Sequence, residues 1–88
     1  MDFGQALAIV KNGGRVTRAA WGGNSFLYLV PGSIFTVNRP PLLGIYEEGT
    51  PISYRPHLDL RAADGSCVPW QASQGDVMAE DWEEVKAG

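Results

Sequence analysis

Prolines concentrate in one stretch of the chain and limit where regular structure can form. Five of the six prolines lie in this stretch, together with three glycines: Pro31, Pro40, Pro41, Pro51 and Pro56. Proline lacks a backbone donor and fixes φ, so it interrupts helices and central strands. The stretch also shows no sustained period. We therefore expect a long irregular loop over residues 31–56, with the regular elements on either side of it.

The sequence before this loop predicts one helix. Phe3, Ala6 and Val10 follow the spacing of a single helix face, and Asp2 with Gln5 can form a capping box. The sequence Asn-Gly-Gly at residues 12–14 provides a left-handed stop. These features indicate a helix over residues 3–12.

Two strands are predicted between this helix and the loop. Residues 15–18 alternate in polarity, as in a short edge strand. Residues 26–30 read Phe-Leu-Tyr-Leu-Val and end at Pro-Gly, which is typical of a central strand buried on both faces.

The sequence after the loop predicts a hairpin, a short helix and a last strand. Residues 56–62 alternate, residues 63–66 form a turn and residues 67–70 return. A second capping box, from Ser73 to Asp76, opens a helix that ends at residue 78 or 79. Residues 81–85 alternate as a strand that places Trp82 in the core. We expect one α+β domain over residues 1–88, with the N-terminal helix packed on an antiparallel sheet.

Composition and charge exclude several classes of function. The hydrophobic content of 44% and charged content of 19% are those of a folded chain. A net charge of −3, without a run of Lys or Arg, disfavours DNA and RNA polymers. The acidic start and the lack of an apolar stretch of about 20 residues argue against a signal peptide and a membrane span. Cys67 is the only cysteine, which suits the cytoplasm.

The sequence contains no constellation that indicates catalysis. His57 is the only histidine, and neither a nucleophile elbow nor a phosphate loop is present. We therefore expect no catalytic residues, no metal site and no cofactor. Hydrolysis of a nucleotide with Asp76, Glu80 or His57 as acid or base remains an alternative, although a helix cap explains Asp76 more simply.

Aromatic and apolar residues point to binding instead. Trp21 and Trp70 lie where the chain changes direction, so each could line a ligand pocket or belong to the core. Ile34, Phe35 and Ile45 are among many apolar residues of the loop, which we expect to pack against another subunit. A module that contacts a host protein through the same residues is a further alternative.

Five segments in order resemble one protein family over nearly the whole chain. They read FLYLVPGS at 26–33, TVNRPPLLG at 36–44, YRPHLDL at 54–60, DGSCVPW at 64–70 and SQGDVMAEDW at 73–82. They resemble the Thoeris anti-defence sponge family, second type. This resemblance implies a phage-encoded homotetramer that sequesters glycocyclic ADP-ribose, the signal made by Thoeris TIR enzymes, without cleaving it. It also implies that cyclic dinucleotides of CBASS immunity could be held at a separate site.

The resemblance and the chemistry of the ligands together suggest two sets of binding residues. Stacking on a purine would come from aromatic residues, and pyrophosphate would be bound by Arg side chains and by N–H groups at a helix start. The first set comprises Trp21, Tyr28, Trp70, Ser73, Asp76 and Arg18, with Arg15 as a further donor. Trp21 precedes a Gly-Gly-Asn-Ser turn that departs from the family pattern and leaves the ligand selectivity at this edge open.

The second set combines cations with flat apolar surface in the loop. It comprises Arg39, Pro40, Tyr54, Arg55 and His57. Alternatively, Arg39 and Arg55 form salt bridges at a subunit interface, and His57 forms a hydrogen bond in the sheet.

Overall fold

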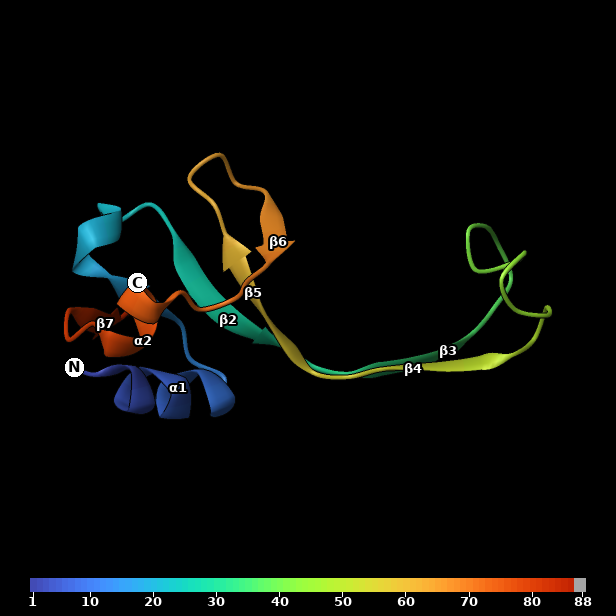
Figure 1. The fold of residues 1–88 in the computed structure, drawn as a ribbon, viewed down its shortest axis with the longest axis horizontal. Helices are drawn as coiled ribbons and strands as arrows, with labels where there is room; N and C mark the ends of the chain where they lie inside the picture. The colour runs from blue at the N-terminus through green and yellow to red at the C-terminus, as the bar shows by residue number, and fades with distance from the viewer. Residues whose placement is uncertain (87–88) are drawn as a thin grey trace.

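The structure is a computed structural model that describes residues 1–86, and it has two parts (Figure 1). The body contains both helices and a five-stranded sheet. The arm, residues 33–54, extends away from the body as a long hairpin with a folded tip. The molecule is correspondingly elongated, with principal extents of 46 × 30 × 26 Å.

Helix α1, Phe3–Lys11, forms as the sequence predicts. The Asp2 carboxylate accepts a hydrogen bond from the Gln5 backbone N–H at 2.8 Å, and the Gln5 side chain accepts one from the Asp2 N–H at 3.0 Å. This capping box satisfies two of the donors that a helix start leaves free. Ala6 and Val10 face inward and are fully buried.

The sheet of the body is antiparallel, and its strand order is β6-β5-β2-β1-β7. The strands are β1 (Val16–Arg18), β2 (Phe26–Val30), β5 (His57–Arg61), β6 (Cys67–Pro69) and β7 (Trp82–Glu84). The predicted hairpin is confirmed as β5 and β6, and β2 is central as predicted. The prediction that residues 15–18 form an edge strand is wrong, because β7 returns from the end of the chain and pairs with β1.

Helix α1 covers one face of the sheet, and the core lies between them. Ala6, Val10, Val16, Leu27 and Trp82 form this core, each no more than 1% exposed. Within β2 only Leu27 is fully buried, and its neighbours in the strand are partly exposed. The prediction that β2 is buried on both faces is therefore wrong, since no helix within residues 1–86 covers the side opposite α1 (Figure 1).

Most of the segment predicted as an irregular loop belongs to the arm. Strand β3 (Ser33–Thr36) pairs with β4 (Pro51–Tyr54), so the expectation of an irregular segment over residues 31–56 is wrong at both ends. Pro51 is tolerated because it is the first residue of a strand in a two-stranded ribbon. Only the tip, residues 37–50, is irregular. Val37 is fully buried at the base of this tip. Its backbone N–H donates to the Thr50 carbonyl, and its carbonyl accepts from the Gly49 N–H.

Helix α2, Gln74–Met78, follows β6 and precedes β7. Its capping box is confirmed: the Ser73 hydroxyl accepts from the Asp76 N–H at 3.0 Å, and the Asp76 carboxylate accepts from the Ser73 N–H at 3.0 Å. The cap fixes the start of α2 beside the end of β6. It therefore places Asp76 close to the aromatic residues of the body.

Candidate functional site

A pocket in the body brings together three of the predicted ligand-binding residues. Trp21, Trp70 and Asp76 line it with Ser25 and Leu60, and its volume is about 320 Å³. We refer to it as the tryptophan pocket. Its walls come from the short 3-10 turn Ala19–Trp21, the end of β5, the residue after β6, and α2. Segments from both ends of the chain therefore meet at one site.

The two indole rings of the pocket rest on a third one. The Trp21 and Trp70 rings are 6.4 Å apart and edge to face, at 71°. The ring of the buried Trp82 lies 5.3 Å from Trp21 and 6.1 Å from Trp70. Trp82 is itself fixed, since its Nε1 donates to the Asp76 carbonyl at 2.9 Å. Trp21 and Trp70 are thus both pocket wall and outer layer of the core, and each keeps an exposed part.

Arg18 lies beside this pocket and is held by two carboxylates. Its Nε donates to Asp81 at 2.8 Å, and a terminal nitrogen donates to Asp76 at 3.0 Å. These bonds raise the pKa of Arg18, with the bond to Asp81 as the largest cause. Arg18 is therefore a fixed positive charge at the edge of the pocket, with 20% of its side chain exposed.

Asp76 is the charged residue that lines the pocket. Burial by itself raises the pKa of its carboxyl, but the hydrogen bonds from Ser73 and Arg18 outweigh burial and lower the pKa overall. The group is therefore a carboxylate at neutral pH, with one oxygen on Arg18 and the other on the Ser73 N–H. Ser73 itself contributes to the cap and to the position of α2.

Tyr28 is not brought into the tryptophan pocket. Side chains alternate across a strand, and Tyr28 follows Leu27, which points into the core. Tyr28 therefore lies on the uncovered face, opposite Asp59 of β5. A hydrogen bond with Cys67, followed by burial, raises the pKa of Tyr28 to about 12. Arg15 lies on this face as well, over the ring of Phe26 at 5.1 Å.

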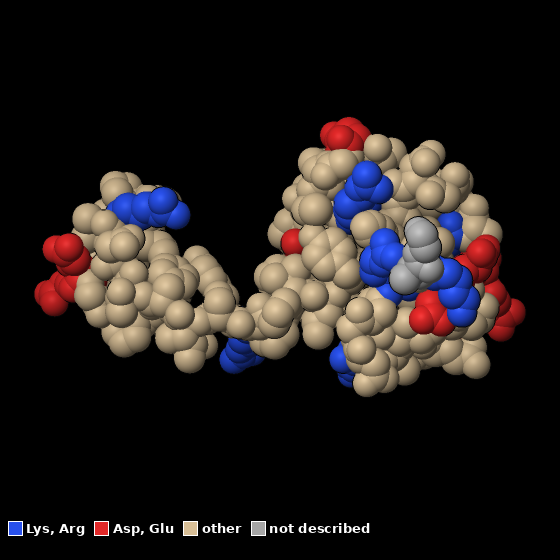
Figure 2. Space-filling view, turned by 180° about the vertical axis from the view of Figure 1, so that it is seen from behind, with Lys and Arg blue, Asp and Glu red and all other residues tan. Residues whose placement is uncertain are grey.

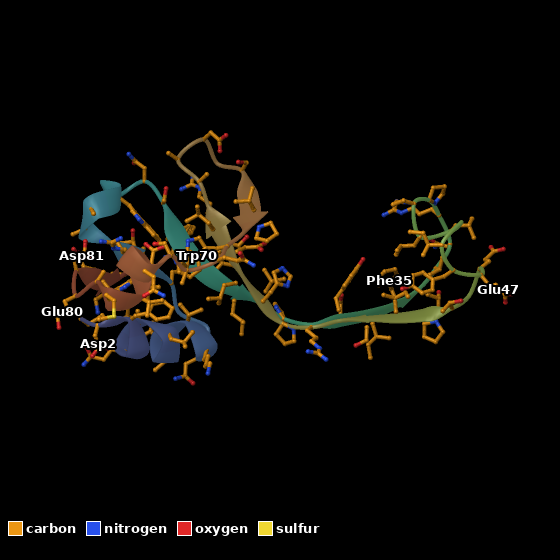
Figure 3. All side chains as sticks on the ribbon, in the orientation of Figure 1. Asp2, Phe35, Glu47, Trp70, Glu80 and Asp81 are labelled. Carbon is orange, nitrogen blue, oxygen red and sulfur yellow. The ribbon has the colours of Figure 1, made fainter. Side chains whose placement is uncertain are left out.

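A second and larger pocket lies in the arm, far from Trp70 (Figure 3). Its volume is about 850 Å³, and Arg39, Pro40 and Tyr54 of the predicted second set line it. The other lining residues are Phe35, Thr36, Val37, Asn38, Pro41 and Leu42. The rings of Phe35 and Tyr54 are 5.3 Å apart and tilted by 36°. We refer to this site as the arm pocket.

Two residues of the predicted second set lie outside the arm pocket. Arg55 is an exposed residue in the connection from β4 to β5. His57 opens β5, where its Nε2 lies 3.2 Å from the Asp59 carboxylate and its Nδ1 3.2 Å from the Arg55 carbonyl. The Asp59 contact is not a well-aligned hydrogen bond, because Oδ1 has no hydrogen-bond partner among the described residues. The hydrogen bond of His57 is therefore with the Arg55 carbonyl, in the connection that precedes β5.

Eight residues of these pockets were not among the predicted site residues, two in the tryptophan pocket and six in the arm pocket. Ser25 and Leu60 line the tryptophan pocket, and Phe35 lines the arm pocket. The sequence identifies Phe35 only as an apolar residue of the loop. Phe35 pairs with Ile52, and this register of β3 and β4 brings its ring close to that of Tyr54. The sequence alone does not give the register.

Charges are mixed over the face of the molecule that Figure 2 shows. Basic and acidic side chains alternate on the body, and acidic side chains lie at the outer end of the arm, where Glu47 is found (Figures 2 and 3). No cluster of three potential metal ligands occurs within residues 1–86. In the same part of the chain, no helix has the length and apolar character to cross a membrane.

The chain is similar to proteins of one known family. Residues 1–85 match the family described as Tad2-like, the Thoeris anti-defense 2-like domain. The chain is also similar to a protein of Bacillus phage SP01 described as Thoeris anti-defense 2. The two are 35% identical over 86 residues, which cover 97% of this chain and 94% of the phage protein.

Proposed function

The chain belongs to the Thoeris anti-defense 2-like family, and from this premise we propose that it is a phage protein that silences Thoeris immunity by binding a nucleotide signal. The proposed ligand is glycocyclic ADP-ribose. The protein would act in the infected bacterial cell, hold the signal and leave it uncleaved.

The observation that carries this proposal is the tryptophan pocket. Two partly exposed indole rings and one carboxylate surround a cavity of about 320 Å³. A purine can stack on an indole, which contributes about 1 to 3 kcal/mol per base, and its amino group can donate to a carboxylate. Asp76 is placed for this, and Arg18 holds its carboxylate in position at the edge of the pocket.

The size of the pocket favours an assembly of subunits. About 320 Å³ lies at the lower end of the range of about 300 to 1,000 Å³ that is usual for ligand pockets. One base and part of a sugar would fill it, and the rest of the signal would project outward. We therefore propose that another subunit completes the site in a homotetramer. Tyr28 could take part only in this way, because it lies on the other face of its own sheet.

The arm provides the apolar surface that such an assembly needs. Ile34 is 78% exposed and Ile45 69% exposed, and Tyr46 and Tyr54 also present much of their surface. Exposed apolar groups gathered on one projecting element are typical of a protein interface. We propose that the arm packs against neighbouring subunits. Contact with a host protein through the same surface is the competing interpretation.

Sequestration is favoured over hydrolysis by the state of the acidic and basic groups. Of Asp76, Glu80 and His57, only Asp76 lines the tryptophan pocket. Its lowered pKa makes it a poor proton donor, and its two oxygens are already bonded to Arg18 and Ser73. His57 is engaged at the root of the arm.

The arm pocket supports a second candidate ligand of the same protein, a cyclic dinucleotide of CBASS immunity. Its volume of about 850 Å³ suits two nucleotides, and it offers the rings of Phe35 and Tyr54 for stacking. Arg39 could bind phosphate from the side of the pocket. Arg55 and His57 lie outside the lining of this pocket, at the root of the arm.

Native mass spectrometry of the full chain, with and without glycocyclic ADP-ribose, tests the proposal. We expect the mass of four subunits and the added mass of intact ligand. After removal of free ligand, heating should release a signal that has its original retention time and still activates its Thoeris effector. Cleaved product, or loss of far more signal than there are sites, would establish the hydrolase alternative. Absence of bound ligand at micromolar concentrations would refute binding.

A further inference from the structure

Asp81 forms hydrogen bonds both with the backbone beside Trp21 and with Arg18, the side chain that also bonds to Asp76. Its Oδ2 accepts from the Ala20 N–H at 3.1 Å, and its Oδ1 accepts from Arg18 at 2.8 Å. Its carbonyl also accepts from the Ala19 N–H at 3.0 Å. The two amides that precede Trp21 are therefore both tied to Asp81, which lies in the segment between α2 and β7.

Arg18 connects this attachment to the opposite wall of the tryptophan pocket. Its second bond goes to Asp76, whose other oxygen accepts from the Ser73 N–H. An unbroken line of bonds thus runs from the turn that carries Trp21, through Asp81, Arg18 and Asp76, to the start of α2. These bonds therefore connect the two walls of the pocket.

We propose that Asp81 is a positioning residue, which sets the orientation of Trp21 and its distance from Asp76 through Arg18, and so prepares the pocket before the ligand arrives. The consequence for binding rests on the function proposed above. The 3-10 turn has only three residues and no side-chain cap at its start, so it has little stability of its own. Preorganised rings bind better, because the cost of ordering them is not subtracted from the binding free energy.

This proposal gives Arg18 a different task from direct contact with the ligand. A guanidinium bonded to two carboxylates is held in one orientation and adds little free positive charge, since the group of three has a net negative charge. Its planar fork suits it to bridge two acids whose separation is fixed. The substitution Arg18→Lys would keep the charge but lose the fork.

The substitution Asp81→Asn tests the proposal without any ligand. We expect the Ala20 amide to exchange its hydrogen at least about tenfold faster, because a charge-assisted network is lost, while core amides such as that of Leu27 stay protected. The Trp21 indole N–H resonance should move, because the turn that carries Trp21 loses its attachment to Asp81. In the wild type, the Ala20 amide shift should titrate with Asp81 in acid, and this titration should vanish in the variant.

Glu83→Gln is the matched control, since Glu83 is an exposed acid of β7 two residues further on. Unchanged Ala20 exchange and an unchanged Trp21 resonance in Asp81→Asn would overturn the proposal, and so would equal deprotection of the Leu27 amide. Calorimetry with glycocyclic ADP-ribose adds the functional arm, in which we expect a loss of affinity of at least about fivefold for Asp81→Asn and none for Glu83→Gln. If the wild type binds no ligand, the proposed function fails, while the ligand-free spectra still decide the role of Asp81.

Discussion

At the scale of single residues, the three tryptophans show how one core serves two purposes. Trp82 is 1% exposed and fills the space under α1, with Phe3 at a ring distance of 5.5 Å. Trp21 and Trp70 each pack against the Trp82 ring in an edge-to-face arrangement, and part of each ring stays exposed. A chain of this size has few residues for a core. Because the walls of the tryptophan pocket pack directly on that core, the pocket is rigid without further supporting elements.

Replacing Trp21 with alanine should separate binding from folding. The exposed part of the ring is free to stack on a purine, so Trp21→Ala should weaken binding of glycocyclic ADP-ribose by at least about tenfold in calorimetry. Circular dichroism should show that the fold is kept. By contrast, Trp82→Ala removes a fully buried side chain and should cost about 3 to 5 kcal/mol of folding free energy. Unchanged affinity in Trp21→Ala would show that the ligand binds elsewhere.

Asp76 should make the stability of the protein depend on acidity. Its folded pKa lies below the ordinary value of about 3.9. Its contribution is therefore present above that ordinary value and is lost as the pH falls through the folded pKa. The urea midpoint of the wild type should fall between pH 5 and pH 2 by more than that of Asp76→Asn, where these pH values are about one to two units on either side of the ordinary value. Equal slopes for the two proteins would mean that the bonds from Ser73 and Arg18 contribute no net stabilisation.

At the scale of elements, local signals predict structure well and distant pairings do not. The capping boxes at Asp2 and Ser73 start the two helices where the sequence predicts them, because a cap depends only on residues three positions apart. The place of β1 in the sheet depends instead on β7, which is more than sixty residues away in sequence. No period in residues 15–18 could reveal that partner.

The arm and the pockets show the same difference between local signals, which the sequence reveals, and distant pairings, which it does not. The prolines predict an irregular loop over residues 31–56, and this prediction is wrong where β3 and β4 pair. Pro51 is compatible with the first residue of an edge strand, so its presence does not exclude the ribbon. The sequence brings Trp21, Trp70 and Asp76 forward as site residues, and the structure gathers them in one pocket. It could not exclude Tyr28, because strand register decides the face on which a side chain lies.

The cap of α2 should matter for stability in a measurable way. Ser73→Ala removes the hydroxyl that accepts from the Asp76 N–H, so we expect a loss of about 1 kcal/mol in the free energy of unfolding. Because α2 carries Asp76 at the edge of the pocket, affinity for the ligand should fall as well. Ser53→Ala, an exposed serine of β4, is the control. A urea titration in which both variants match the wild type would contradict a role for this cap.

Binding in the arm pocket should depend on Arg39 and not on Arg55. Arg39→Ala should impair binding of a cyclic dinucleotide and spare glycocyclic ADP-ribose, because Arg39 lines the arm pocket and not the tryptophan pocket. Arg55→Ala removes the same charge from outside that pocket and serves as the matched control. Isothermal titration with both ligands measures this. Equal loss of both ligands in Arg39→Ala would indicate one shared site or a disrupted assembly.

At the scale of the whole molecule, the projecting arm with its exposed apolar residues favours association with another protein chain. Val37 is buried within the arm, but Ile34 of β3 and Ile45 and Tyr46 of the tip are exposed to solvent. The arm that carries them projects from the body (Figure 1). Isolated exposed apolar residues are normal, whereas several on one projecting hairpin are not. A hairpin of two strands is also only marginally stable by itself. Packing between subunits would address both problems.

The last prediction is therefore a tetramer that depends on the arm. Light scattering at micromolar concentration should give the mass of four subunits for the wild type, and Ile34→Glu should lower that mass, because a charge placed in an apolar contact must be desolvated without a partner. Val68→Glu is the control: Val68 is 45% exposed on β6 of the body and should leave the assembly intact. Tight capture of the signal should fail together with assembly, since sequestration needs an affinity near nanomolar, about 12 kcal/mol, which one small pocket does not provide alone. A monomeric wild type would refute the tetramer, and a wild-type tetramer that Ile34→Glu leaves whole would place the interface outside the arm.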